Sequence, residues 1–195
     1  MSAPRRLRTR LEAGLGWRTW AASLAVFLAF LVFVLPAEAE RTREVTGTNE
    51  TPDTSYRYAS DDLYRLAEQY GEEGRAHYVR SRYTFDVVWP LAYGAFLQAS
   101  LLLASRRTAL GRLPTVLVAL PIVTVVADYL ENTSAAVVMA RYPAETPVLA
   151  SAAPVFTFVK WNLLYASFGL VVVGALLGLV DVGRRRRGRA RSGHG

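Results

Sequence analysis

Asp128-Tyr129-Leu130-Glu131-Asn132 lies inside an apolar run that extends from residue 113 to residue 140. Two carboxylates and an amide in the middle of such a run carry a large free-energy cost if they face lipid. Together with Thr124, these polar residues recur at helical spacing, so they form one polar stripe on an otherwise apolar helix. We therefore expect a membrane-spanning helix whose polar stripe points into a bundle.

Three further apolar runs have spanning length or come close to it, at residues 20–35, 84–104 and 152–180. A bilayer core takes about 20 apolar residues in a helix, with roughly 17 to 25 as the usual range. Backbone polar groups in lipid must be paired within their own element, which favours helices over short isolated strands. The sequence therefore predicts an all-α membrane protein, with four transmembrane helices as a bundle and an external amphipathic helix.

The distribution of basic residues indicates the orientation. Of the 23 lysines and arginines, 14 lie before the first run, between the second and third runs, or after the fourth. In the segment from residue 37 to residue 83, acidic residues outnumber arginines. Because basic loops stay in the cytoplasm, we expect a multi-pass protein of the cytoplasmic (inner) membrane with both termini cytoplasmic.

This topology divides the chain into nine segments. They are a basic cytoplasmic segment (1–19), transmembrane helix 1 (20–36), an external segment (37–83) with an amphipathic helix at about 61–80, transmembrane helix 2 (84–105), a cytoplasmic loop (106–112), transmembrane helix 3 (113–140), an external loop (141–151), transmembrane helix 4 (152–181) and an Arg-rich cytoplasmic tail (182–195). Residues 40–59 are expected to be irregular, and Gly71 and Gly74 to interrupt the amphipathic helix. For helix 1 a second interpretation stays open, because a basic start, an apolar core and Ala37-Glu38-Ala39 also describe a cleavable signal peptide.

Charged residues in the other spans are the expected partners of the polar stripe. With a rise of about 1.5 Å per residue, Asp128 lies near the bilayer centre, and Glu131 and Asn132 lie roughly 6–8 Å outward. Lys160 and Asp86 come out roughly 9 and 12 Å outward by the same reckoning. We therefore predict one acidic pocket that faces outward. Its ligand-binding residues are Asp86, Asp128, Glu131, Asn132 and Lys160, and its supporting residues are Tyr83, Tyr93 and Thr124, with Arg82 and Arg141 at the rim.

Three interpretations of this pocket remain. Its surplus negative charge favours the binding or passage of a small cationic or lipidic ligand. Paired carboxylates at different depths also suit acid–base chemistry by a membrane-embedded enzyme on a lipid substrate. In a purely structural or partner-binding protein, Lys160 would pair with Asp128 or Glu131, Asp86 would pair with Arg82, and the network would fix the register of the helices.

Two prolines inside the spans should free backbone carbonyl groups, because proline has no N–H to donate. Pro90 would free the carbonyl of Asp86, and Pro121 would bend its helix and free the carbonyl of Leu117.

The sequence indicates neither a cofactor nor a metal site. The chain has no cysteine, and neither of its histidines lies in a span; His77 is expected at the external surface. The expected partners are the lipid bilayer and anionic lipid head groups at the Arg-rich ends, and not nucleic acid. Gly174 and Gly178 form a small-residue face, which suits packing within the chain or a homo-oligomer.

Five short motifs between residues 60 and 165 share their order with one family. They are Tyr70-Gly71-Glu72-Glu73-Gly74-Arg75, Thr84-x-Asp86-x-x-Trp89-Pro90-Leu91-x-Tyr93, Asp128-x-x-Glu131-Asn132, Arg141-Tyr142-Pro143 and Phe158-x-Lys160-Trp161. In these motifs the chain resembles a family of uncharacterised four-helix integral membrane proteins of prokaryotes. The resemblance implies an uncleaved first helix, and it implies no activity.

Overall fold

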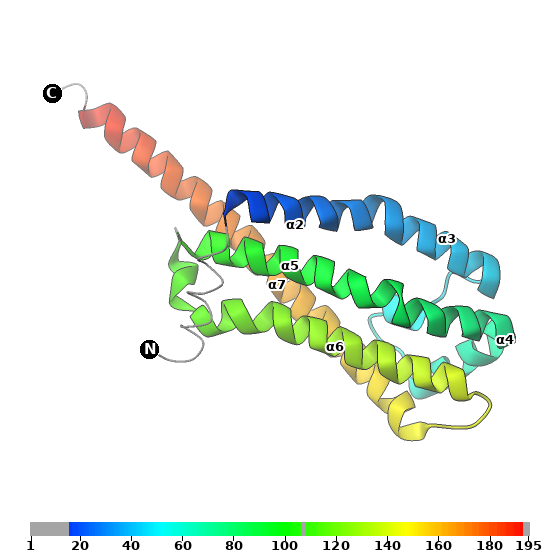
Figure 1. The fold of residues 1–195 in the computed structure, drawn as a ribbon. Coiled ribbons are helices and arrows are strands. Elements are labelled where there is room, and N and C mark those ends of the chain that lie inside the picture. Colours follow the sequence, from blue (N-terminus) through cyan, green and yellow to red (C-terminus); the bar gives the residue numbers. More distant parts are fainter. Residues whose placement is uncertain (1–15, 107, 193–195) are drawn as a thin grey trace.

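The computed structural model describes residues 16–106 and 108–192, and these residues form helices and connecting turns without any strand (Figure 1). The α-helices are Trp17–Ala29 (α2), Leu35–Thr46 (α3), Ser60–Tyr83 (α4), Phe85–Ser105 (α5), Pro114–Arg141 (α6) and Pro147–Ser192 (α7). Shorter turns are Phe30–Val34 (η1), Pro52–Thr54 (η2) and Ala109–Arg112 (η3). Residues 1–15 of the predicted basic segment, the arginine side chains of the tail and His194 lie outside what is described.

Within the described residues, four helical stretches are long and apolar enough to cross a membrane. They are Trp17–Thr46, Ser60–Ser105, Thr115–Arg141 and Pro147–Gly183. The predicted all-α class with four helices of spanning length is therefore confirmed.

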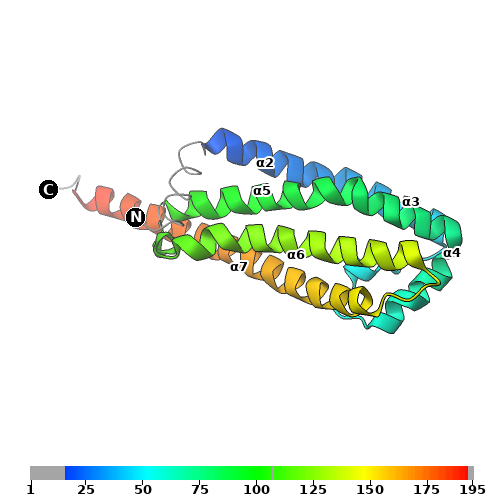
Figure 2. The same ribbon diagram turned by 60° about the horizontal axis from the view of Figure 1, so that its bottom comes forward.

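The helices form an elongated bundle (Figures 1 and 2). Helices α5, α6 and α7 pack against one another, and α2 lies along α5. Helix α4 packs on α6 and α7 at one end, which we name the α4 end. At the opposite end, α7 continues beyond the bundle (Figure 1). The predicted polar stripe of residues 124–132 lies on α6, the helix that contacts α4, α5 and α7.

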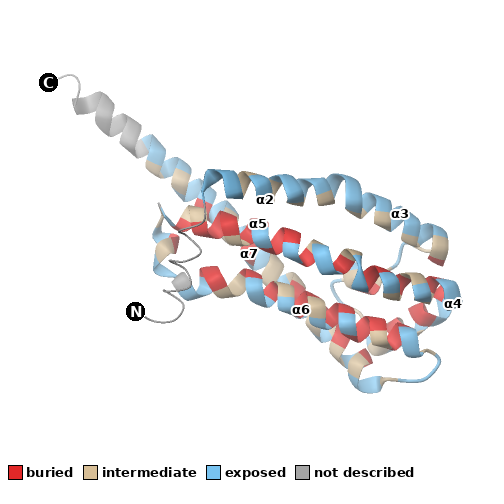
Figure 3. Cartoon of the chain, viewed as in Figure 1, coloured by how far each residue is buried: buried red, intermediate tan, exposed pale blue. Residues whose placement is uncertain are grey.

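The first helix, made of α2, η1 and α3, is continuous from Trp17 to Thr46 and ends at Gly47, whose φ is 70°. Residues 40–46 are therefore helical, whereas the sequence predicted an irregular segment there. The helix widens to a π-helical turn over Phe30–Val34, just before Pro36, which cannot donate a backbone hydrogen bond. No residue from Trp17 to Leu35 is buried (Figure 3), so this helix is held along one face only.

Contacts with α4 explain why the first helix continues past Pro36. The hydroxyl of Ser81 donates to Oε1 of Glu38 at 2.6 Å, and Oγ1 of Thr42 lies 3.2 Å from Nε2 of His77. His77 was predicted to be a surface or interfacial residue; its side chain is partly covered by α3 and remains 13% exposed. Polar side chains from distant parts of the sequence thus stabilise a helical segment that has little apolar character of its own.

Helix α4 is amphipathic, and its apolar face packs on α6 and α7. Leu63, Leu66, Tyr70 and Tyr78 are buried together in one core cluster, with Ala135, Val138, Met139, Ala150 and Ala153. Gly71 interrupts the helix as predicted, because its φ of 63° lies in the left-handed region that glycine adopts without strain. Gly74 does not interrupt it, since the helix continues through this residue to Tyr83.

Pro121 frees a backbone carbonyl in α6, and a side chain of α5 compensates for the lost bond. The amide Nε2 of Gln98 donates to the carbonyl oxygen of Leu117 at 2.9 Å. Leu117 stands four residues before Pro121, so its carbonyl is the one that the proline leaves without an intrahelical donor. The predicted free carbonyl is therefore present, and it links α5 to α6.

We predict that Gly174→Val lowers the free energy of unfolding by about 1–3 kcal/mol, as is usual for an overpacked core. A Cβ atom at Gly174 would lie 2.7 Å from Cβ of Ala104 and 3.0 Å from Cδ1 of Leu110. Gly178→Val is the matched control, because a Cβ there meets no atom within 4 Å. Thermal unfolding of both variants in detergent tests this prediction. Equal losses would contradict the packing of Gly174 within the chain.

Candidate functional site

Three of the predicted site residues come from the polar stripe of α6. Asp128, Glu131 and Asn132 each expose 5% or less of their surface. The opposite side of α6 is apolar and exposed, with Val126 and Leu130 as examples. The stripe therefore faces into the bundle, where other side chains can offset the cost of burying its charges.

Helix α7 supplies the ammonium group that meets this stripe. Nζ of Lys160 lies 2.5 Å from Oε2 of Glu131 and 3.7 Å from Oδ1 of Asp128. Lys160 is itself buried, with 7% of its surface exposed. The sequence predicted a pair of Lys160 with Asp128 or Glu131; the structure shows contacts with both acids, and they join α6 to α7.

Helix α4 supplies a second buried cation, Arg82. Its Nη1 lies 2.7 Å from Oδ2 of Asp86 on α5 and donates to Oδ1 of Asn132 at 3.2 Å. Its guanidinium also lies over the ring of Tyr78, 4.3 Å from the centroid. Arg82 was predicted at the rim of the pocket, but it lies at the centre because α4 packs onto the end of the bundle.

The loop between α3 and α4 brings in a carboxylate that sequence reasoning missed. Oδ1 of Asp53, in η2, accepts a hydrogen bond of 3.2 Å from Nη2 of Arg82, and Oδ2 forms an ion pair with Nη1 of Arg82 at 3.2 Å. The backbone carbonyl of Asp53 accepts a hydrogen bond of 3.2 Å from Nε1 of Trp161 and lies 3.5 Å from Nζ of Lys160. No local pattern marks Asp53, since it stands in a polar stretch whose place depends on tertiary contacts.

Hydrogen bonds to Asp128 complete a closed ring of contacts. Nδ2 of Asn132 donates to Oδ1 of Asp128 at 3.0 Å, and the hydroxyl of Tyr93 donates to Oδ2 at 2.8 Å. The ring passes from Arg82 through Asn132 and Asp128 to Lys160, and returns through Asp53. We name these residues the polar cluster; its members are Asp53, Arg82, Asp86, Tyr93, Asp128, Glu131, Asn132 and Lys160.

Three of the predicted supporting residues do not join the polar cluster. Tyr83 is 56% exposed, and Arg141 is also exposed. Both stand near helix ends, with their side chains turned away from the bundle. Thr124 is fully buried on the same face as Asp128, but its hydroxyl donates to the carbonyl of Leu120 in its own helix, at 2.8 Å.

The charges of the polar cluster do not balance. As defined from the described residues, it holds four carboxylates against the two cations Arg82 and Lys160. For Asp53, burial raises the pKa of the carboxyl, but the charges of Arg82 and Lys160 and hydrogen bonds from Arg82 and Thr51 outweigh it, so this pKa lies below its usual value. Asp53 is therefore ionised at neutral pH.

A cavity of about 380 Å³, which we name the inner cavity, opens next to the polar cluster. Asp53, Asp86, Asp128 and Lys160 form its polar end. The rest of its wall is mainly apolar and comes from the first helix, α5 and α7: Phe27, Leu31, Leu35, Trp89, Leu164 and Phe168. The inner cavity thus combines a charged end with a mainly apolar wall formed by helices of spanning length.

Among the described residues, no group of three or more histidine, cysteine, aspartate or glutamate side chains is arranged to hold a metal ion. No protein family, curated protein or solved structure matches this chain. The geometry of the polar cluster and the inner cavity is therefore what bears on its function.

Proposed function

We propose that this chain is a multi-pass membrane protein that binds a lipidic ligand with a cationic head group in the inner cavity. The observation that carries the proposal is the union, in one cavity, of apolar walls and surplus carboxylates. The head group lies at Asp53, Asp86 and Asp128, and the hydrocarbon chain lies against the first helix and α7.

The size and walls of the inner cavity support this ligand class. Ligand pockets usually enclose roughly 300–1,000 Å³ and are mainly apolar with a few polar groups. The volume of about 380 Å³ fits a head group and part of one hydrocarbon chain. Leu31, in the wall, is 46% exposed, so the cavity is open beside it and the hydrocarbon chain can continue toward the surrounding lipid. A small hydrated ion would gain no favourable contacts from these apolar walls.

We further propose that the protein lies in the cytoplasmic membrane with both termini in the cytoplasm. Arg106 and Arg112 lie at the end of the bundle opposite α4, as does the Arg-rich tail after α7. Basic segments of this kind are retained in the cytoplasm. The α4 end then faces outward, with α4 as the external amphipathic helix.

We predict that hexadecylamine stabilises the protein in uncharged maltoside micelles, whereas hexadecanol and butylamine do not. A ligand at a hundred times its Kd adds about 2.7 kcal/mol, which for a protein of this size corresponds to roughly 5–11 °C in Tm. Hexadecanol lacks the charge for the carboxylates, and butylamine lacks the chain for the apolar walls. Thermal unfolding with each compound measures the difference.

Two variants locate the effect at the inner cavity. Asp128→Asn removes a carboxylate of its polar end, and Leu164→Trp fills its apolar part; both should abolish the stabilisation. Asp61→Asn, an exposed carboxylate at the start of α4, should leave it unchanged. If hexadecylamine stabilises all variants equally, the inner cavity is not its site. If lipids are converted to products by the wild type and not by Asp128→Asn, the protein is a membrane-embedded enzyme instead.

A further inference from the structure

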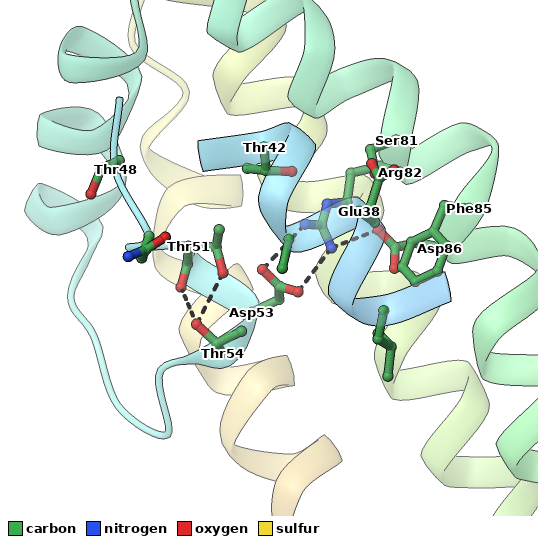
Figure 4. A pocket seen from close by; sticks show the side chains of 13 residues that line it. Glu38, Thr42, Thr48, Thr51, Asp53, Thr54, Ser81, Arg82, Phe85 and Asp86 are labelled. Carbon is green, nitrogen blue, oxygen red and sulfur yellow. Dashed lines mark hydrogen bonds and ion pairs between the residues drawn. The ribbon is translucent and has the colours of Figure 1, made fainter. Parts of the chain in front are cut away.

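A second cavity, of about 370 Å³, lies at the α4 end between α3, the η2 loop and the start of α5 (Figure 4). We name it the hydroxyl pocket. Its walls carry the hydroxyl groups of Thr42, Thr48, Thr51, Thr54 and Ser81, together with the carboxylates of Glu38, Asp53 and Asp86. Its wall therefore carries more polar side chains than that of the inner cavity, beside the apolar Leu35, Ala39 and Phe85.

The two cavities meet at the same pair of carboxylates. Asp53 and Asp86 line the inner cavity on one side and the hydroxyl pocket on the other. Arg82 lies between them, and its Nη1 contacts Oδ2 of Asp53 at 3.2 Å and Oδ2 of Asp86 at 2.7 Å (Figure 4). Because one nitrogen contacts both carboxylates, Asp53 and Asp86 lie close enough together for one small cation on the pocket side of Arg82 to contact both.

The side chains of the hydroxyl pocket offer acceptors for a hydrated cation. Within its described lining, three carboxylates face one guanidinium. Ser81 donates to Glu38 at 2.6 Å, and Thr51 and Thr54 bond each other at 2.9 Å, so several hydroxyl oxygens keep lone pairs available. Such a lining recognises an ammonium group that carries further hydroxyl groups.

We propose that the hydroxyl pocket is a second binding site, for a small water-soluble amine that bears hydroxyl groups. Its ammonium lies at Asp53 and Asp86, and its hydroxyl groups bond Thr42, Thr48 and Ser81. Since the inner cavity uses the same two carboxylates, the two ligands exclude each other. This exclusion rests on the proposed function, whereas the binding of the small amine does not.

Ethanolamine and propylamine form a matched pair of probes, because they differ by one hydroxyl group at equal charge and similar size. Equilibrium binding of each to the full chain in maltoside micelles should give a Kd at least tenfold lower for ethanolamine. Thr42→Val/Ser81→Ala should raise the Kd of ethanolamine at least tenfold and leave the stabilisation by hexadecylamine unchanged. Leu164→Trp should abolish the stabilisation by hexadecylamine and leave the Kd of ethanolamine unchanged. Thr133 is an exposed residue of α6, so Thr133→Val should change neither the Kd nor the stabilisation.

Competition distinguishes the failure of this inference from failure of the proposed function. Hexadecylamine should raise the apparent Kd of ethanolamine in proportion to its concentration; simultaneous binding would overturn the sharing of Asp53 and Asp86. Absence of saturable ethanolamine binding, or equal binding by the double variant, would overturn the site. If the double variant does not fold, Thr42→Val alone carries the same expectation. Binding of ethanolamine without binding of hexadecylamine would contradict the proposed function and would support the hydroxyl pocket as a binding site.

Discussion

Replacing Lys160 with methionine is expected to lower the free energy of unfolding by about 3–5 kcal/mol, the usual cost of removing one partner from a buried ion pair. Glu131 would lose the only cation within 4 Å of its carboxylate among the described residues, and Asp128 would lose one of its three partners. Because methionine fills much of the same volume as lysine, the loss in free energy of unfolding is due mainly to the carboxylates that are left without a cation. Thermal unfolding of the purified variant measures it.

A second change should restore most of this stability. In Lys160→Met/Glu131→Gln, the uncompensated charge at residue 131 is gone, so the double variant should unfold at a higher temperature than Lys160→Met. The matched control is Arg65→Met, since Arg65 also lies 2.5 Å from a carboxylate, that of Glu50, but both side chains are about half exposed. Exposed pairs contribute up to about 1 kcal/mol. A loss as small for Lys160→Met as for Arg65→Met would show that the buried pair does not hold the bundle together.

Replacing Arg82 with methionine should be about as damaging, at roughly 3–5 kcal/mol, and should also release a segment of the chain. The guanidinium contacts Asp53 and Asp86, so its removal leaves two carboxylates without their cation. The substitution also removes the hydrogen bond and the ion pair through which Arg82 holds Asp53, and with it η2, against α4. Limited proteolysis should then cut within residues 47–59 at lower protease concentration than in the wild type.

The neighbouring exposed arginine provides the comparison for Arg82. Arg80→Met should leave both the unfolding temperature and the cleavage pattern unchanged, because this side chain lies on the exposed face of α4. If cleavage within 47–59 is the same in Arg82→Met and Arg80→Met, the hydrogen bond from Trp161 and other contacts of the η2 loop suffice to hold it.

The helices of spanning length and the inward stripe of α6 could be predicted because lipid would impose strong local constraints on such a sequence. A run of apolar residues must be helical, and a charged residue within it must face the protein. The pairing of Lys160 with Glu131 follows from their similar depth, and the contact with Asp128, one turn deeper, follows from the length of the lysine side chain. These inferences need only spacing and hydrophobicity, which the sequence displays directly.

The α4 end could not be predicted in the same way, because tertiary contacts across the chain determine it. The helical turns after Pro36 are polar, and they are stabilised by Ser81 and His77 about forty residues later. Asp53 reaches the polar cluster through a loop that is held by contacts with distant residues, among them Arg82, Trp161 and Tyr70. No periodicity in residues 40–59 relates them to either partner, so both the continued helix and the additional carboxylate were missed.

The single-sided attachment of the first helix has a consequence for maturation of the protein. Phe27, Leu31 and Leu35 form one apolar wall of the inner cavity, and Glu38 lines the hydroxyl pocket. A peptidase that cut after Ala39 would remove all four residues while leaving α5, α6 and α7 in contact. The wall that the first helix gives to both cavities would then be missing, so the proposed binding sites require an N-terminus that is not cut at this position.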